Sequence, residues 1–91
     1  MISQTTKNLR EMFGELPGDI QRRAKEAYRR FEQNPFHSGL NFKRVHSGLP
    51  IYAVRITRDY RAVGIQKDSV MVWFWIGSHS DYDKLLKQLS K

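Results

Sequence analysis

The sequence predicts an α+β fold with a single domain over residues 1–91. Two N-terminal segments repeat apolar residues at the helical period, the middle of the chain has strand patterns, and the last segment is again helical. A chain of 91 residues has room for one compact core, and its 40% hydrophobic content excludes a disordered chain. We therefore expect two N-terminal helices packed on a small twisted antiparallel sheet of three to four strands, followed by a C-terminal helix.

Two amphipathic segments with a break between them predict the N-terminal helices. The first helix is expected over residues 6–15, capped by Thr5 or Thr6, with an apolar face formed by Leu9, Met12, Phe13 and Leu16. A Pro-Gly pair at 17–18 breaks it. The second helix ends at Asn34 and the proline after it. Its outer side is strongly basic, and its apolar stripe consists of Ile20, Ala24, Ala27, Tyr28 and Phe31.

Alternating and continuous apolar patterns predict the sheet. A short polar strand is expected over residues 41–46, and a hairpin over residues 52–57 and 60–66. Residues 70–76 are apolar on both faces, which is typical of a central strand that is covered on both sides. A very short strand can precede the first helix at residues 2–4.

The C-terminal helix begins in a serine-containing turn after Gly77. Ser78 and Ser80 are each followed three residues later by an aspartate, as in a capping box, so either serine can cap the helix. Both aspartates, Asp81 and Asp83, are expected to serve the helix start. The apolar face of this helix is expected from Tyr82, Leu85, Leu86 and Leu89.

Two arginines on the predicted hairpin form a candidate phosphate site. If the loop has three residues, 58–60, then Arg55 faces Val63 and shares one sheet face with Arg61. A two-residue turn would place the two arginines on opposite faces. The apolar pattern favours the longer loop, which collects on the other face Tyr52, Val54, Ile56 and Ala62.

Guanidinium groups suit this role because their planar forks match phosphate oxygens and stay charged at physiological pH. The alternative interpretation is scattered surface charge with no bound ligand. Arg61 is expected to project from the wetter sheet face, so that its removal would leave the fold intact.

His79 is a candidate for proton transfer. It follows the central strand and lies at or near the N-terminus of the last helix, in the kind of loop that carries function. An imidazole is the usual proton donor or acceptor near neutral pH. The alternative is a histidine that only bonds the backbone of its turn. No metal site is expected, because the three histidines show no ligand spacing and the chain has no cysteine.

The charge balance indicates a polyanionic partner. Sixteen Lys and Arg residues against nine Asp and Glu residues give a net charge of +7, which suits nucleic acid or an acidic protein segment. Lys43 and Arg44 extend the basic surface on the polar strand. Trp73 and Trp75 are expected on one face of their strand, in the core rather than stacked on bases. No segment resembles a membrane span or a signal peptide, so we expect a cytoplasmic protein with no membrane partner.

Three short motifs carry a resemblance to a known family. They are Tyr52 with Arg55, residues 59–63 (Asp-Tyr-Arg-Ala-Val) and residues 76–79 (Ile-Gly-Ser-His), in that order. With this length and arrangement, the chain resembles the RelE/ParE superfamily of toxins from type II toxin-antitoxin systems. The resemblance implies a toxin that is inhibited by an antitoxin protein wrapped around it. For RelE-type members it also implies an enzyme that cuts mRNA, usually on the ribosome.

The resemblance also implies roles for single residues. Arg61 matches the strand arginine that contacts the reacting phosphate in RNA-cutting members, and Arg55 matches a basic residue of the preceding strand. His79 matches the histidine that transfers a proton in a subgroup with a Gly-x-His turn. The catalytic tyrosine of RelE-type members falls at Leu85 in this sequence, which is a departure from that type. Further RNA contacts are expected from Lys43, Arg44, Arg58 and Tyr82.

These roles predict an endoribonuclease that needs neither a metal nor another cofactor. The 2′-hydroxyl of the substrate attacks the adjacent phosphate, the two arginines stabilise the charge on the phosphorane, and His79 transfers a proton. Two alternatives stay open. One is a ParE-like inhibitor of DNA gyrase without nuclease activity, and the other is a basic module that binds RNA or an antitoxin without chemistry.

Overall fold

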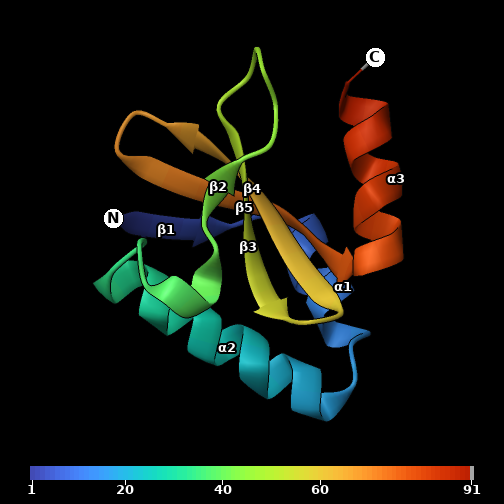
Figure 1. Ribbon diagram of the computed structural model, residues 1–91. Helices are drawn as coiled ribbons and strands as arrows, with labels where there is room; N and C mark the ends of the chain where they lie inside the picture. Colours follow the sequence, from blue (N-terminus) through green and yellow to red (C-terminus); the bar gives the residue numbers. More distant parts are fainter. Residues whose placement is uncertain (91) are drawn as a thin grey trace.

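The computed structural model describes residues 1–90, which form three α-helices and a five-stranded sheet (Figure 1). The predicted α+β fold, with two N-terminal helices and one C-terminal helix, is confirmed. None of the helices within residues 1–90 combines the length and the apolar composition that crossing a membrane requires. The elements in chain order are β1 (Ile2–Thr5), α1 (Lys7–Gly14), α2 (Gly18–Gln33), the 3-10 turn η1 (Ser38–Leu40), β2 (Lys43–Arg44), β3 (Ile51–Thr57), β4 (Tyr60–Lys67), β5 (Val70–Ser78) and α3 (His79–Leu89).

The sheet differs in two ways from the predicted three to four antiparallel strands. Its strand order is β1-β5-β4-β3-β2, so β1 is a fifth strand. This strand runs parallel to β5, with Ile2 opposite Val70 and Thr5 opposite Trp73. A parallel pair needs a long connection, which the helices and the other three strands supply here. A four-residue pattern carries no sign of strand direction, so the sequence alone could not reveal this pairing.

Side-chain caps fix where α1 and α3 begin. The Oγ1 atom of Thr6 accepts a hydrogen bond from the backbone N of Leu9 at 3.1 Å, so the second of the two candidate threonines caps α1. The Oγ atom of Ser78 accepts a hydrogen bond from the backbone N of Asp81 at 3.3 Å. The first of the two candidate serines therefore caps α3, and His79 is the first residue of that helix.

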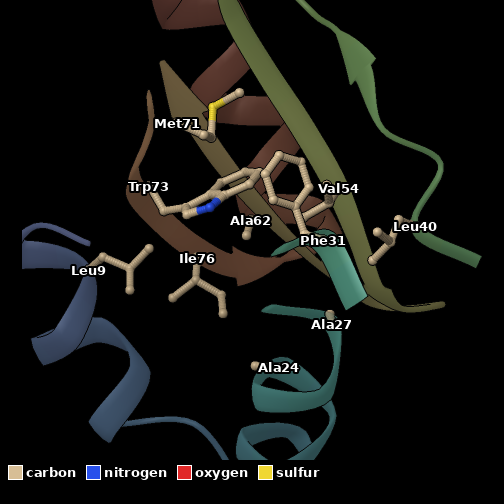
Figure 2. Packing of buried hydrophobic residues seen from close by; sticks show 10 residues of the cluster. All are labelled: Leu9, Ala24, Ala27, Phe31, Leu40, Val54, Ala62, Met71, Trp73 and Ile76. Carbon is tan, nitrogen blue, oxygen red and sulfur yellow. The ribbon is translucent and has the colours of Figure 1, made fainter. Parts of the chain in front are cut away.

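The first core lies between the two N-terminal helices and one face of the sheet (Figure 2). At its centre, the Phe31 ring of α2 makes edge-to-face contacts with Trp73 of β5 and with Phe42, at centroid distances of 5.1 and 5.0 Å. The predicted apolar stripes of both helices thus face the sheet. The buried residues of this core are Leu9, Ala24, Ala27, Phe31, Leu40, Val54, Ala62, Met71, Trp73 and Ile76.

The second core lies between α3 and the opposite face of the sheet. Val63 of β4 and Tyr82 of α3 are buried in it, together with Ile51 and Ala53 of β3. The predicted apolar face of the last helix is confirmed, because its three leucines pack against this cluster. Helices therefore cover both faces of the sheet, and the second face continues past the core toward the β3–β4 turn.

A β-bulge in β5 separates the two tryptophans. Val63 pairs with Trp75, but the next residue, Gly64, pairs with Trp73, so that Phe74 is an extra residue in β5. Trp73 consequently packs in the first core, whereas Trp75 packs against the second. The prediction that both tryptophans lie on one face is wrong. A bulge shifts the alternation by one residue, and a strand that is apolar on both faces gives no sign of that shift.

Gly64 provides a test of this close packing between β4 and β5. A Cβ atom there would lie 2.8 Å from Cε3 of Trp73 and 2.9 Å from the backbone O of Val72. We expect Gly64→Ala to lower the free energy of unfolding by about 1–3 kcal/mol, because the overpacked strands must shift. The control is Gly14→Ala, which meets no atom within 4 Å and should leave that free energy unchanged or slightly higher. Urea unfolding measures both; equal stability of the two variants would contradict the packing.

Candidate active site

Arg55 and Arg61 lie directly opposite each other on β3 and β4. The turn between the strands has two residues, since Thr57 pairs with Tyr60, and a bulge between Arg55 and Thr57 adds one residue to β3. The predicted three-residue loop, with Arg55 opposite Val63, is therefore wrong. The predicted consequence is nevertheless confirmed, because the bulge restores a register in which both arginines share one sheet face.

The pairing concentrates positive charge that the surrounding chain does not neutralise. Like charges directly opposite each other in a sheet are destabilising. Within residues 1–90, the single ion pair joins His79 and Asp83, so neither Arg55 nor Arg61 has a carboxylate partner there. We expect a face arranged in this way to attract an anion, because a bound phosphate would offset the repulsion between the guanidinium groups.

Arg61 is anchored to the backbone of the turn that precedes it. Its side chain is half-buried, in contrast to the exposed Arg55. Within residues 1–90, its Nε and Nη2 atoms make no hydrogen bond, and both stay available as donors. The Nη1 atom donates hydrogen bonds to the backbone carbonyls of Thr57 (2.7 Å), Arg58 (3.1 Å) and Tyr60 (3.0 Å).

His79 is tied to the same turn through its backbone and to α3 through its ring. Its backbone N donates a hydrogen bond to the carbonyl of Asp59 at 2.7 Å. Its Nδ1 atom lies 3.3 Å from Oδ2 of Asp83, one helical turn later, and about half of its side chain is exposed. Asp83 therefore contacts the candidate histidine in addition to lying in the first turns of the helix. The four-residue spacing was the sequence signal for this contact.

Tyr82 contacts the histidine ring and lies close enough to Arg61 to interact with its charge. Its ring is only 5% exposed and meets the His79 ring edge-on at a centroid distance of 5.9 Å. Burial raises the pKa of the Tyr82 phenol, the positive charge of Arg61 opposes this shift, and the negative charge of Asp83 adds to it. The phenol thus stays neutral at physiological pH and is a hydrogen-bond donor there. Because the residue is buried, its ring offers little surface on which a base could stack.

The other predicted RNA-contacting residues do not all lie on this face. Lys43 pairs with Ala53, two residues before Arg55, so its exposed side chain shares the face of the paired arginines. Arg44 belongs to the opposite face, and its Nε and Nη2 atoms donate hydrogen bonds to carbonyls of the loop after β2, at 3.0 and 3.4 Å. Arg58 is exposed in the turn itself. Within residues 1–90, no three acidic or histidine side chains form a group that could hold a metal ion.

Trp75 is an additional residue of this face, which the sequence analysis assigned to the core rather than to base stacking. Gly77 lies opposite Arg61 in the sheet. A Cβ atom on Gly77 would lie 2.9 Å from the Trp75 ring, so the ring extends over this glycine. Trp75 is half-buried, which leaves part of the indole accessible. The bulge in β5 brings the indole to this face, and only the structure shows that bulge.

A sequence-family model for the ParE-like toxin domain matches residues 18–84, from the start of α2 into α3. This chain belongs to the ParE-like toxin family. The match includes the hairpin with the paired arginines and the start of α3 with His79, and the predicted place in the RelE/ParE superfamily is confirmed. The subgroup with a Gly-x-His turn stays a prediction. No curated protein sequence matches this toxin significantly.

Solved structures of related folds agree with this assignment. The fold of this toxin is similar to a chain of the RelB-RelE antitoxin-toxin complex from Methanococcus jannaschii, with a TM-score of 0.73 and 17% identity over 89% of this chain and 96% of that one. The isolated Escherichia coli RelE toxin gives 0.65 and 14% identity, covering 96% of each chain. The YoeB/ParE toxin from Agrobacterium tumefaciens has a TM-score of 0.68 and 13% identity, over 87% of this chain and 99% of that one. At these identities the likeness concerns the fold.

The anchoring of Arg61 raises the expected cost of its removal above the small loss that is typical of a surface residue. We expect Arg61→Ala to lower the free energy of unfolding by about 1–2 kcal/mol, because three hydrogen bonds to the turn are lost. Thermal unfolding followed by circular dichroism should show a melting temperature lower by roughly 4–8 °C or more. Arg55→Ala is the matched control and should cost nothing, since it removes an exposed charge from the opposite position. Equal losses in the two variants would contradict the anchoring role.

Proposed function

We propose that this toxin is an endoribonuclease that cleaves mRNA, in association with the ribosome, by metal-free attack of the substrate's own 2′-hydroxyl. The 2′-oxygen bonds to the adjacent phosphorus, and the 5′-oxygen of the next nucleotide leaves. The upstream product then carries a 2′,3′-cyclic phosphate. The observation that supports this proposal most is the anchored Arg61, which lies opposite Arg55 and beside the start of the helix that carries His79.

The paired arginines would stabilise the charge that develops on the phosphorane. Arg61 has one terminal nitrogen fixed by three carbonyls, so its remaining donors are held in place before the substrate arrives. Donors fixed in this way need no reorganisation during the reaction and typically contribute the largest part of catalysis. Arg55, on the facing strand, would supply a second guanidinium to the same phosphate.

His79 would transfer the proton. Its Nδ1 atom faces Asp83, which leaves Nε2 as the nitrogen available to the substrate. At that position, Nε2 takes the proton from the 2′-hydroxyl or gives one to the leaving 5′-oxygen. Asp83 would act as a positioning residue that orients the ring, and Tyr82 would support the ring from the core through its edge contact. The substrate supplies the nucleophile, so no nucleophilic side chain is required.

Additional contacts would hold the RNA on the open part of the face. Lys43 shares the face of the paired arginines and would bind backbone phosphate. Trp75 offers a partly accessible indole over Gly77, next to Arg61, where a base would stack. The predicted RNA contact of Arg58 fits its place in the turn. Arg44 is directed to its own loop on the other face and would contribute only to the overall basic charge.

An antitoxin protein is the partner that this function requires. RelE chains from Methanococcus jannaschii and Pyrococcus horikoshii were solved in complexes with RelB. By analogy, we infer an antitoxin with acidic segments for this chain, whose net charge is +7. Opposite charges would speed the encounter, and apolar contacts would set the lifetime of the complex.

A second candidate function follows from the description of the family as ParE-like. In this alternative, the protein inhibits DNA gyrase and has no nuclease activity. The two candidates differ in products. A nuclease leaves cut mRNA and intact DNA topology, whereas a gyrase inhibitor changes supercoiling and leaves mRNA whole. A basic module that binds RNA without chemistry would do neither.

The histidine gives the sharpest test of the nuclease. We expect His79→Gln to bind RNA normally and to cleave it about 10²–10⁴-fold more slowly, because glutamine preserves size and hydrogen bonding but transfers no proton near neutral pH. The matched control is His37→Gln, an exposed histidine that caps η1 far along the chain and should keep the parent rate. Mapping of new RNA ends on ribosomes programmed with mRNA measures both.

The products and the substrate supply independent checks. The upstream fragment should end in a 2′,3′-cyclic phosphate or its opened 3′-phosphate, and a 2′-deoxy substitution at the cut site should block cleavage. EDTA should have no effect on the rate. Loss of cleavage in EDTA, full activity of His79→Gln, or altered DNA supercoiling without any new RNA ends would each contradict the proposal.

A further inference from the structure

A cleft lies at the edge of the sheet, beside the β3–β4 turn that carries part of the candidate active site. It has a volume of about 250 Å³ and lies between α2, η1 and the end of β3. Strand β2 pairs only with Tyr52 and Ala53, so the last residues of β3 have no strand neighbour on this edge within residues 1–90. Four arginines line the cleft: Arg23 and Arg30 from α2, Arg55 from β3 and Arg58 from the turn.

The charge of this cleft is not balanced within the described part of the chain. Glu26 is the one acidic residue that lines it, against four guanidinium groups. None of the four arginines forms an ion pair within residues 1–90. Arg23 and Arg30 are seven residues apart, so they lie on the same side of α2, about 10 Å apart along its axis. This places two guanidinium groups along one wall of the cleft and two along the other.

The cleft shares one residue with the face proposed to carry the reaction. Arg55 lines the cleft and also pairs with Arg61 across the hairpin. A nucleic-acid strand in the cleft would therefore reach the proposed site of the reacting phosphate through Arg55.

On the basis of the proposed function, we infer that this cleft binds phosphates of the substrate RNA strand next to the one that is cleaved. A polynucleotide carries one charge per nucleotide and is bound largely through those charges. A stably bound protein segment would also need apolar contacts. The apolar residues that line the cleft, Ala27, Leu40 and Ile56, are buried or half-buried, and none of the large exposed hydrophobic residues of the chain lines it. The cleft thus favours RNA backbone over an acidic protein segment.

Arg23 and Arg30 are then substrate-binding residues that lie outside the catalytic groups. They would bind phosphates of the strand beside Arg55. Because they do not touch the reacting atoms, their loss should weaken RNA binding. Removal of both charges should reduce the salt dependence of RNA binding, since two phosphate contacts are lost.

A double variant with a matched control tests this inference. Arg23→Gln/Arg30→Gln removes the two cleft arginines, and Arg22→Gln/Arg29→Gln removes two exposed arginines of α2 with the same spacing that do not line the cleft. The probe is a short single-stranded RNA with 2′-O-methyl groups, which binds without being cut. Its binding constant is measured over a series of salt concentrations for the parent and for both variants. Far-UV circular dichroism verifies that each variant keeps its helices.

The expected result is a selective change in slope. The logarithm of the binding constant falls linearly with the logarithm of salt concentration. For the cleft variant, this negative slope should be shallower than that of the parent by about 1.4. The control variant should stay close to the parent. Equal changes in the two variants, or no binding of the probe by the parent, would overturn the inference. A further contradicting result would be that the cleft arginines are needed for binding of a poly-glutamate peptide but not for binding of the RNA probe.

Cleavage of unmodified RNA separates this inference from the proposed function. A parent that cleaves RNA, with a cleft variant that behaves like the control, would refute the cleft and leave the nuclease standing. A parent whose probe binding depends on the cleft, but which cleaves no RNA, would refute the nuclease and leave the cleft as an RNA-binding site. In single-turnover reactions, the cleft variant should need more RNA than the control variant to reach half of its maximal cleavage rate.

Discussion

The short turn between β3 and β4 is held from two sides, and the positions of the candidate catalytic groups depend on it. From within the hairpin, Nη1 of Arg61 donates to three backbone carbonyls. From outside, the backbone N of His79 donates to the carbonyl of Asp59 at 2.7 Å. These bonds join the arginine strand to the first residue of α3. A single small turn therefore sets the geometry between the group proposed to bind phosphate and the group proposed to transfer a proton.

The same region departs from what stability alone would favour. Arg55 and Arg61 face each other without a carboxylate between them in residues 1–90, and further unpaired arginines line the neighbouring cleft. Proteins usually break local rules of this kind at functional sites, where a ligand compensates for the cost. The helices on both faces of the sheet supply the stability that allows this, since each covers a separate apolar core. The charge excess is thus a feature of the binding surface and not of the core.

Much of the fold could be predicted because periodicity reports burial directly. The helix faces, the cap at Ser78 and the hairpin all followed from local patterns. The bulges at Ile56 and Phe74 could not be predicted, because an extra residue in a strand leaves no characteristic sequence at either position. In β3, the shorter turn and the bulge each shift the alternation by one residue, and the two shifts cancel. The prediction that both arginines share one face is therefore correct, although the predicted turn length is wrong. The contact between His79 and Asp83 has a visible spacing, but only the structure shows the rings and carboxylate together.

The central claim is that Arg61 is held by the turn while its free nitrogens face the scissile phosphate. Nitrogen-15 NMR of the arginine Nε–H groups, with and without the 2′-O-methyl RNA, measures this directly. The Arg61 signal should be resolved in the free protein and should shift on RNA binding. The signal of Arg10 in α1, whose Nη1 atom donates to Thr5, should not shift. An Arg61 signal that stays unchanged while other arginine signals shift would contradict the account.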